Sequence, residues 1–85
     1  MKILDYVVQT PVGIHARNAL LLSQLTSQFQ SDIHIRKGER TENAKKVMHV
    51  MSLGIDCNDV ISFMITGDDE EMAYEMVKEF CEGNL

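Results

Sequence analysis

Residues 13–18, with the sequence GIHARN, combine the residue types that could hold a phosphoryl group. A glycine precedes the imidazole of His15, a stretch typical of a helix follows it, and a guanidinium comes two residues later. If the helix begins near Ala16, its unpaired backbone N–H groups point back at the His15 side chain and form an anion site beside a nucleophile. The segment therefore predicts a histidine that carries a phosphoryl group covalently.

The predicted helix start acts on both forms of His15. The positive end of a helix dipole disfavours the imidazolium, so the neutral imidazole, which is the nucleophile, is favoured. After transfer, the negative phosphoryl group would meet the amides of Ala16, Arg17 and Asn18 and the fork-shaped guanidinium of Arg17. The alternative is that His15 and Arg17 are ordinary surface residues of a loop and of a first helical turn.

Length and composition are typical of one small globular domain spanning residues 1–85. Of its residues, 45% are hydrophobic and 25% are charged. No apolar run approaches the roughly 18 residues of a membrane span, so we expect no membrane insertion. The first residues lack the apolar core of a secretory signal, which favours the cytoplasm. The net charge of −5 argues against nucleic acid as a partner.

The spacing of cysteine and histidine indicates no metal and no cofactor. His15, His34 and His49 form no ligand pair at helical spacing. Cys81 falls on an apolar helical stripe, so we expect it in the core. The sequence also lacks a nucleophile supported by a carboxylate and a glycine-rich phosphate loop, the features that would indicate a stand-alone enzyme. The sequence therefore argues against a stand-alone enzyme, such as a small hydrolase that uses His15.

Hydrophobic periodicity predicts the elements that must position the GIHARN segment. Alternation at period two predicts strands over residues 2–9, 32–37 and 61–65. A hairpin turn at residues 37–40, with Gly38 in it, predicts a short returning strand over residues 40–43. Apolar positions at helical spacing predict a helix over residues 16–29 and a short helix from Val47 that stops at Gly54. A last helix is predicted with Asp68 as N-cap, Glu71 as capping-box partner and Gly83 as its end.

These elements predict an α+β fold of two layers. Each strand has one polar face and each helix has one apolar stripe, so the helices cover one side of a mainly antiparallel sheet and the other side faces water. A split β-α-β arrangement, ferredoxin-like or an open-faced sandwich, fits this pattern. The clearest stripe belongs to the last helix and contains Met72, Ala73, Met76, Val77, Phe80 and Cys81.

Two segments resemble the histidine-containing phosphocarrier protein (HPr) family of the bacterial phosphotransferase system. GIHAR at 13–17 is similar to the active-site signature of the family without its final proline, and VMHVMSLG at 47–54 is similar to its short second helix. The resemblance extends from about residue 2 to residue 83 without a gap. It implies an open-faced β-sandwich with a four-stranded antiparallel sheet and three helices on one face.

The resemblance also implies a function. Nδ1 of His15 would accept a phosphoryl group from enzyme I charged by phosphoenolpyruvate and pass it to sugar-specific enzymes II, including IIA-type proteins, during sugar uptake. The family binds its partners through an apolar surface near the histidine, and methionine suits a surface that fits several partners. The matching positions here are Leu20, Leu21, Gln24, Val47, Met48, His49 and Met51. The alternative is that some of these apolar residues belong to the core.

Three positions depart from the pattern of the family. Asn18 stands where proline is usual, and its side chain could cap the helix or contact the phosphate. Val12 replaces a common hydroxyl residue, and Lys46 replaces a serine that a kinase phosphorylates in many members, so that switch cannot operate here. These departures leave open a regulatory HPr paralogue that binds a transcription regulator or a metabolic enzyme without efficient phosphoryl relay.

Overall fold

Seven elements follow one another along residues 1–85 of the computed structural model, and each coincides with a predicted strand or helix. The longest helix has 15 residues, and none combines the length and apolar character that crossing a membrane requires. The elements are β1 (Lys2–Val7), α1 (Ala16–Thr26), β2 (Asp32–Lys37), β3 (Arg40–Asn43), α2 (Val47–Met51), β4 (Val60–Thr66) and α3 (Glu70–Asn84).

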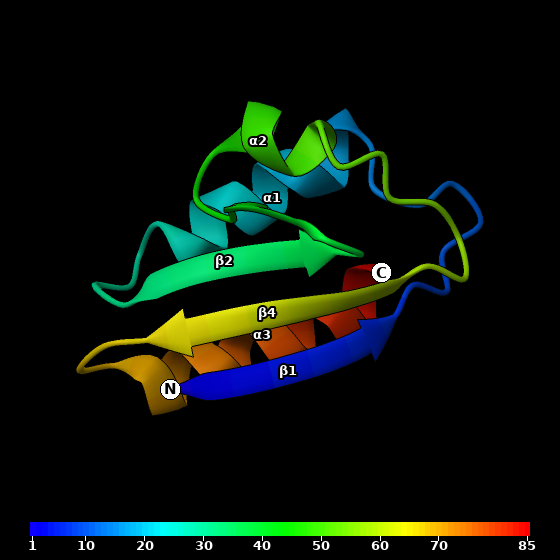
Figure 1. Ribbon diagram of the computed structural model, residues 1–85. Coiled ribbons are helices and arrows are strands. Elements are labelled where there is room, and N and C mark those ends of the chain that lie inside the picture. The colour runs from blue at the N-terminus through cyan, green and yellow to red at the C-terminus, as the bar shows by residue number, and fades with distance from the viewer.

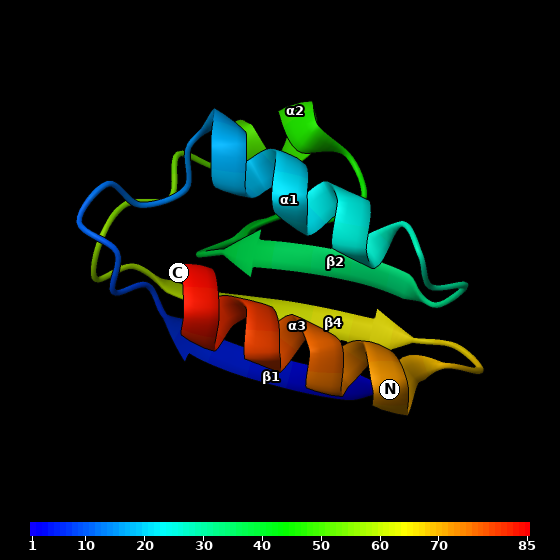
Figure 2. The same ribbon diagram turned by 180° about the vertical axis from the view of Figure 1, so that it is seen from behind.

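The four strands form one antiparallel sheet in the order β1-β4-β2-β3. Because β4 lies between β1 and β2, the arrangement is a split β-α-β fold. α3 lies behind β1 and β4 in Figure 1, and in Figure 2 α1 and α3 run across the near face of the sheet, with α2 beside α1. The opposite face of the sheet is uncovered, so the predicted open-faced sandwich is confirmed.

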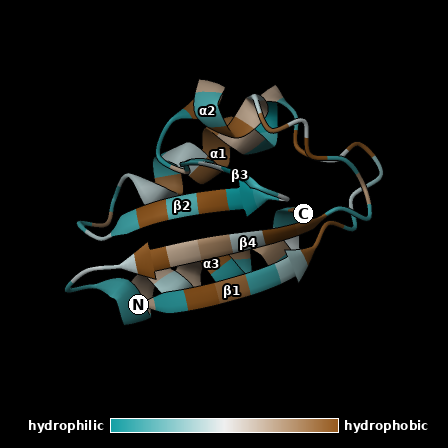
Figure 3. Ribbon diagram, in the orientation of Figure 1, coloured by the Kyte–Doolittle hydropathy of each residue, from teal (hydrophilic) through white to brown (hydrophobic).

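The core lies between the sheet and the helices. Alternate residues of β2, Ile33 and Ile35, point into it, and Figure 3 shows this alternation as brown and teal segments. From α3 the core takes residues four apart, which share one helical face. Other buried residues of the core, from strands and helices, include Leu4, Ala19, Leu22, Ile61, Phe63, Ile65, Ala73, Val77 and Cys81.

Two of the predicted elements are longer than those in the structure. The first helix ends at Thr26 instead of residue 29, because the backbone N–H groups of Gln28 and Phe29 bond carbonyls only three residues earlier and tighten the chain into turns. The first strand ends at Val7 instead of residue 9. The amide of Gln9 turns away from the sheet and bonds the carbonyl oxygen of Leu85.

The predicted cap of the last helix is wrong. The helix begins at Glu70, its N-cap position is Asp69 instead of Asp68, and the Asp69 side chain makes no capping bond to the helix. The carboxylate of Asp69 turns instead to the loop after α1, where it accepts hydrogen bonds from Ser31. Long-range bonds have therefore displaced the local capping box that was expected with Glu71.

The last helix also continues through Gly83 to Asn84, where closure at Gly83 was predicted. The following Leu85 is buried and donates its N–H to the carbonyl of Cys81, which prolongs the helical pattern to the chain end. Met72 and Met76 were predicted on the buried stripe but are exposed. They lie about 100° around the helix from the residues that face the sheet.

Candidate functional site

His15 is the N-cap residue of α1, and the predicted helix start at Ala16 is confirmed. Its backbone is extended, with φ −121° and ψ −178°, and its side chain is exposed. Nδ1 accepts a hydrogen bond from the backbone N–H of Arg17 at 3.2 Å. In this arrangement Nδ1 presents a lone pair instead of a proton, and it faces the first turn of a helix whose amides lack carbonyl partners.

Asn18 closes the same cap from the other side. Its Oδ1 accepts a hydrogen bond from the backbone N–H of His15 at 2.8 Å, and its Nδ2 donates to the carbonyl of Gly13 at 2.9 Å. The residue is only 6% exposed. Both polar groups of the side chain are thus engaged with the main chain, so a contact from Asn18 to a phosphate would have to come from its backbone amide.

The loop before His15 rests on the segment between α2 and β4. Gly13 has φ +65°, and a Cβ at this position would lie 2.3 Å from the carbonyl oxygen of Ile55. The backbone N–H of Ile14 donates to that same carbonyl at 2.9 Å. The site therefore needs glycine at position 13 because the two backbones approach so closely.

Two supports of this loop were missed from the sequence. One is the Ile55 carbonyl, and the other is the carbonyl of Leu85, which accepts hydrogen bonds from the amides of Gln9 and Thr10 at 2.5 and 2.8 Å. Main-chain acceptors leave no signature in residue type, since every residue carries a carbonyl. No sequence pattern could have identified them.

Arg17 occupies the second position of α1 and is exposed. It takes part in none of the five ion pairs of the chain. Its guanidinium is therefore not committed to another side chain, and it can turn toward an anion held on the neighbouring histidine.

The predicted partner-binding residues lie on α1 and α2, which pack beside each other. Leu20 and Leu21 are 47% and 41% exposed, and Met48 is 72% exposed. The expectation that these apolar residues exceed the needs of the core is confirmed, whereas Val47 is half-buried and packs against the core. We define the α1–α2 surface by its exposed members Leu20, Leu21, Gln24, Met48, His49 and Met51.

Fixed charges border this surface on the α2 side. Lys46 is exposed at the N-cap position of α2 and makes no side-chain capping bond. Nδ1 of His49 lies 3.4 Å from Oε1 of Glu42, which also faces the guanidinium of Arg40 at 3.3 Å. The exposed apolar residues of the α1–α2 surface thus have charged groups beside them on the α2 side.

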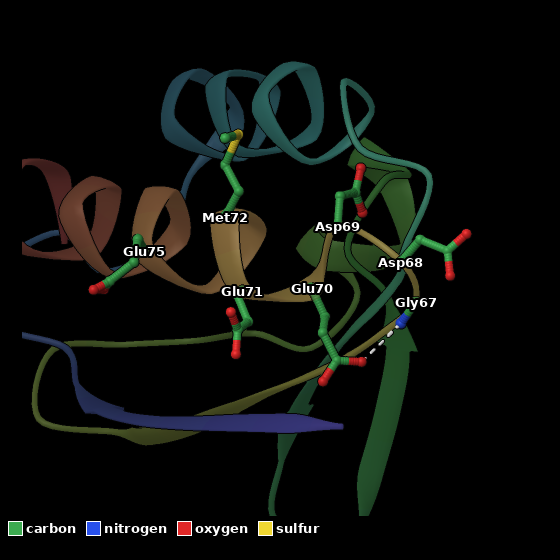
Figure 4. Close-up of a pocket in the computed structure, with 7 residues that line it drawn as sticks. All are labelled: Gly67, Asp68, Asp69, Glu70, Glu71, Met72 and Glu75. Atoms are coloured by element: carbon green, nitrogen blue, oxygen red, sulfur yellow. Dashed lines mark hydrogen bonds between the residues drawn. The ribbon is translucent and has the colours of Figure 1, made fainter.

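A hollow at the start of α3 belongs to a different part of the molecule. It is lined by Gly67, Asp68, Asp69, Glu70, Glu71, Met72 and Glu75. It lies at the end of the sheet opposite the loop that leads into α1 (Figure 2). Figure 4 shows the carboxylates of Asp68, Glu71 and Glu75 pointing in different directions. No group of three residues in the chain is arranged to hold a metal ion.

The two cysteines are free thiols in different surroundings. Cys81 is buried in the core, as its helical position predicted, and this burial raises the pKa of its thiol to about 12. The thiol of Cys57 is partly exposed and lies 3.6 Å from the carbonyl oxygen of Gln9. Neither thiol shares a hydrogen bond with His15.

The chain is similar to known proteins in sequence and in structure. A family model described as "PTS HPr component phosphorylation site" matches residues 4–83. The phosphocarrier protein HPr of Mycoplasma genitalium is 40% identical over 85 residues, which cover 99% of this chain and 97% of that protein. The crystal structure of HPr-C-His from Thermoanaerobacter tengcongensis is similar with a TM-score of 0.92 and 36% identity, over 96% of this chain and 92% of that one.

A further similar structure is the catabolite repression protein Crh of Bacillus subtilis. It is described as a dimer with a swapped domain. The two folds agree with a TM-score of 0.78 at 29% identity, over 94% of this chain and 92% of the Crh chain.

Proposed function

The chain belongs to the HPr family of the phosphotransferase system, and from that premise we propose that His15 carries a phosphoryl group between partner proteins. Enzyme I, charged by phosphoenolpyruvate, is the donor, and sugar-specific enzymes II, through their IIA-type proteins, are the acceptors. The observation that carries the proposal is the exposed imidazole at the N-cap of α1, whose Nδ1 accepts a hydrogen bond from the Arg17 amide. The proposal implies a carrier in the cytoplasm.

Acceptance begins at the lone pair of Nδ1. As the bond between Nδ1 and phosphorus forms, the bond between phosphorus and the donor breaks. The Arg17 N–H, which bonds Nδ1 in the free protein, then becomes a donor to a phosphoryl oxygen. This donor needs little reorientation, because the amide already points at the reacting atom.

The phosphoryl group is held by charge complementarity. The backbone amides of Ala16, Arg17 and Asn18 form the first turn of α1, where the helix dipole is positive. The guanidinium of Arg17 adds a planar, doubly donating partner for the phosphoryl oxygens. Because His15 and Arg17 are exposed, a partner can approach the phosphorus and remove the group again.

The α1–α2 surface is the docking surface in this proposal. It begins one turn beyond His15 on the same helix, and its leucine and methionine side chains are exposed without a partner in the chain. A small apolar contact with a charged margin suits short-lived complexes, since a shuttle has to leave each partner after transfer.

The test is phosphorylation in a defined mixture of this protein, enzyme I and phosphoenolpyruvate. We expect an acid-labile gain in mass of one phosphate, which His15→Ala abolishes. His34→Ala is the matched control, because His34 is exposed on β2 and outside α1 and its cap. The proposal is contradicted if the wild type gains no phosphate while a standard HPr does, or if His15→Ala is still labelled.

A second candidate is a regulatory paralogue that binds a transcription regulator or a metabolic enzyme without efficient relay. The similarity to Crh supports it, together with Asn18 in the active-site loop and Lys46 at the cap of α2. The same mixture separates the two candidates. A regulatory paralogue would remain uncharged while a standard HPr in the same mixture is charged.

A further inference from the structure

We propose that Asn18 is the positioning residue for His15, holding the backbone of the N-cap so that Nδ1 faces the amides of the first turn. The inference rests on the proposed role of His15 as phosphoryl acceptor. Asn18 would not touch the phosphorus through its side chain. It would act instead through the backbone of His15, the residue whose Nδ1 bonds the phosphorus.

The hydrogen bonds of Asn18 tie together both ends of the segment that carries the imidazole. Oδ1 holds the His15 N–H at 2.8 Å, and Nδ2 holds the Gly13 carbonyl at 2.9 Å. Asn18 is itself fixed, since it lies in the first turn of α1 and is 6% exposed. Rotation of the chain between Gly13 and His15 would break at least one of these two bonds.

Neither main-chain group has another partner in the chain. The Gly13 carbonyl and the His15 N–H each form one protein hydrogen bond, and both go to Asn18. Without that side chain, both groups would need hydrogen bonds from water, and the loop would have to open for water to reach them. The Gly13 N–H and the Ile14 N–H would remain anchored, so the change would be concentrated at His15.

The contact that needs this support is the one at Nδ1. The distance from the Arg17 amide to Nδ1 is 3.2 Å, at the long end of the range for N–H donors. A small shift of the cap therefore removes it. Once it is lost, the preference for the tautomer with the proton on Nε2 is weaker, and fewer molecules present a lone pair at Nδ1.

The decisive experiment compares Asn18→Leu with the wild type in two measurements. The first is the ¹⁵N NMR spectrum of the His15 ring in the unphosphorylated protein, which distinguishes protonated from unprotonated ring nitrogens. We expect one dominant tautomer in the wild type and a mixture in Asn18→Leu. The second is the rate of phosphorylation by enzyme I. We expect kcat to fall about tenfold with KM unchanged, because the α1–α2 surface is intact.

Thr26→Val controls for loss of stability alone. Thr26 is fully buried on the same helix, and its hydroxyl bonds the carbonyls of Leu22 and Ala44. We expect this variant to lower the free energy of unfolding while leaving the ring spectrum and kcat at wild-type values. A purely structural role for Asn18 predicts that Asn18→Leu behaves like Thr26→Val, and that result would overturn the proposal.

Asn18→Asp provides a second variant of the same shape. It keeps the acceptor for the His15 N–H but loses the donor to the Gly13 carbonyl, so we expect a ring spectrum between those of the wild type and Asn18→Leu. The ring spectrum does not depend on phosphate. If the wild type fails to take up phosphate, the proposed function fails, whereas a wild-type ring spectrum in both Asn18 variants overturns only the positioning role.

Discussion

The carboxylate of Asp69 accepts hydrogen bonds from both the backbone N–H and the hydroxyl group of Ser31, 38 residues earlier in the chain. These hydrogen bonds join the loop after α1 to the loop before α3. A further bond from the backbone N–H of Gln30, at 2.9 Å, completes the contact. The helices α1 and α3 are thus tied together at the end of the sheet opposite the loop that leads into α1 (Figure 2).

This contact predicts a loss of stability in acid. The Ser31 hydroxyl, followed by the Gln30 amide, lowers the pKa of Asp69 below its ordinary value. A lowered folded-state pKa stabilises the protein above the ordinary carboxyl pKa of about 4, and this stabilisation is lost as the pH falls through the folded-state value. We expect Asp69→Asn to flatten the fall in the free energy of unfolding between about pH 5 and pH 2, measured by urea denaturation.

Asp68→Asn is the control for this titration. Asp68 is exposed and adjacent, but it accepts none of the hydrogen bonds that Asp69 receives. It should leave the pH profile unchanged. A residual slope is expected in all variants, because hydrogen bonds from Lys37 and from the Gly67 amide lower the pKa values of Asp59 and Glu70. An Asp69→Asn profile identical to that of the wild type would contradict the prediction.

Gly13 and Gly38 form a matched pair for testing the loop that leads to His15. Both have positive φ, +65° and +61°, but a Cβ on Gly38 would meet nothing within 4 Å. We expect Gly38→Ala to cost about 1 kcal/mol of unfolding free energy, from backbone conformation alone. Gly13→Ala should cost about 3 kcal/mol or more, because its Cβ would collide with the Ile55 carbonyl. Equal losses in urea denaturation would show that this close approach is not required.

The docking role of the α1–α2 surface predicts a separation between binding and stability. Met48 is 72% exposed, so Met48→Lys should leave the free energy of unfolding nearly unchanged. It should raise the KM for phosphorylation by enzyme I about tenfold, since a charge replaces an apolar contact. Met72→Lys is the control, because Met72 is 66% exposed on α3. If both variants raise KM equally, the docking surface has been placed wrongly.

Arg17 is expected to act while the phosphoryl group is being transferred, by stabilising the charge on its oxygens in the transition state. A charge-assisted hydrogen bond of about 1.5 kcal/mol corresponds to roughly a tenfold effect, so Arg17→Ala should lower kcat for phosphorylation by about that factor. Arg36→Ala is the control, because Arg36 is an exposed arginine on β2. Kinetics of Arg17→Ala that match those of Arg36→Ala would remove the guanidinium from the mechanism.

The sequence by itself determined the order of the elements and the place of the imidazole at a helix start. These features depend on signals within a few residues: alternation in a strand, apolar spacing in a helix, and a turn glycine such as Gly38 with φ +61°. The surplus of apolar residues on α1 and α2 could be recognised for the same reason, since a helix has only one face for the core. The buried position of Cys81 followed from its helical spacing.

Only the tertiary structure decided which strand lies beside which and what supports the loop that carries His15. Asn18 could have faced the phosphate, but burial turned its side chain to the Gly13 carbonyl and the His15 amide. The carboxylate of Asp69 accepts a hydrogen bond from Ser31 instead of capping its own helix. The carbonyl of Leu85 accepts hydrogen bonds from the loop before α1. Such choices depend on groups that meet only when distant segments pack, and the hydrogen bonds that these groups then make outweigh local preferences.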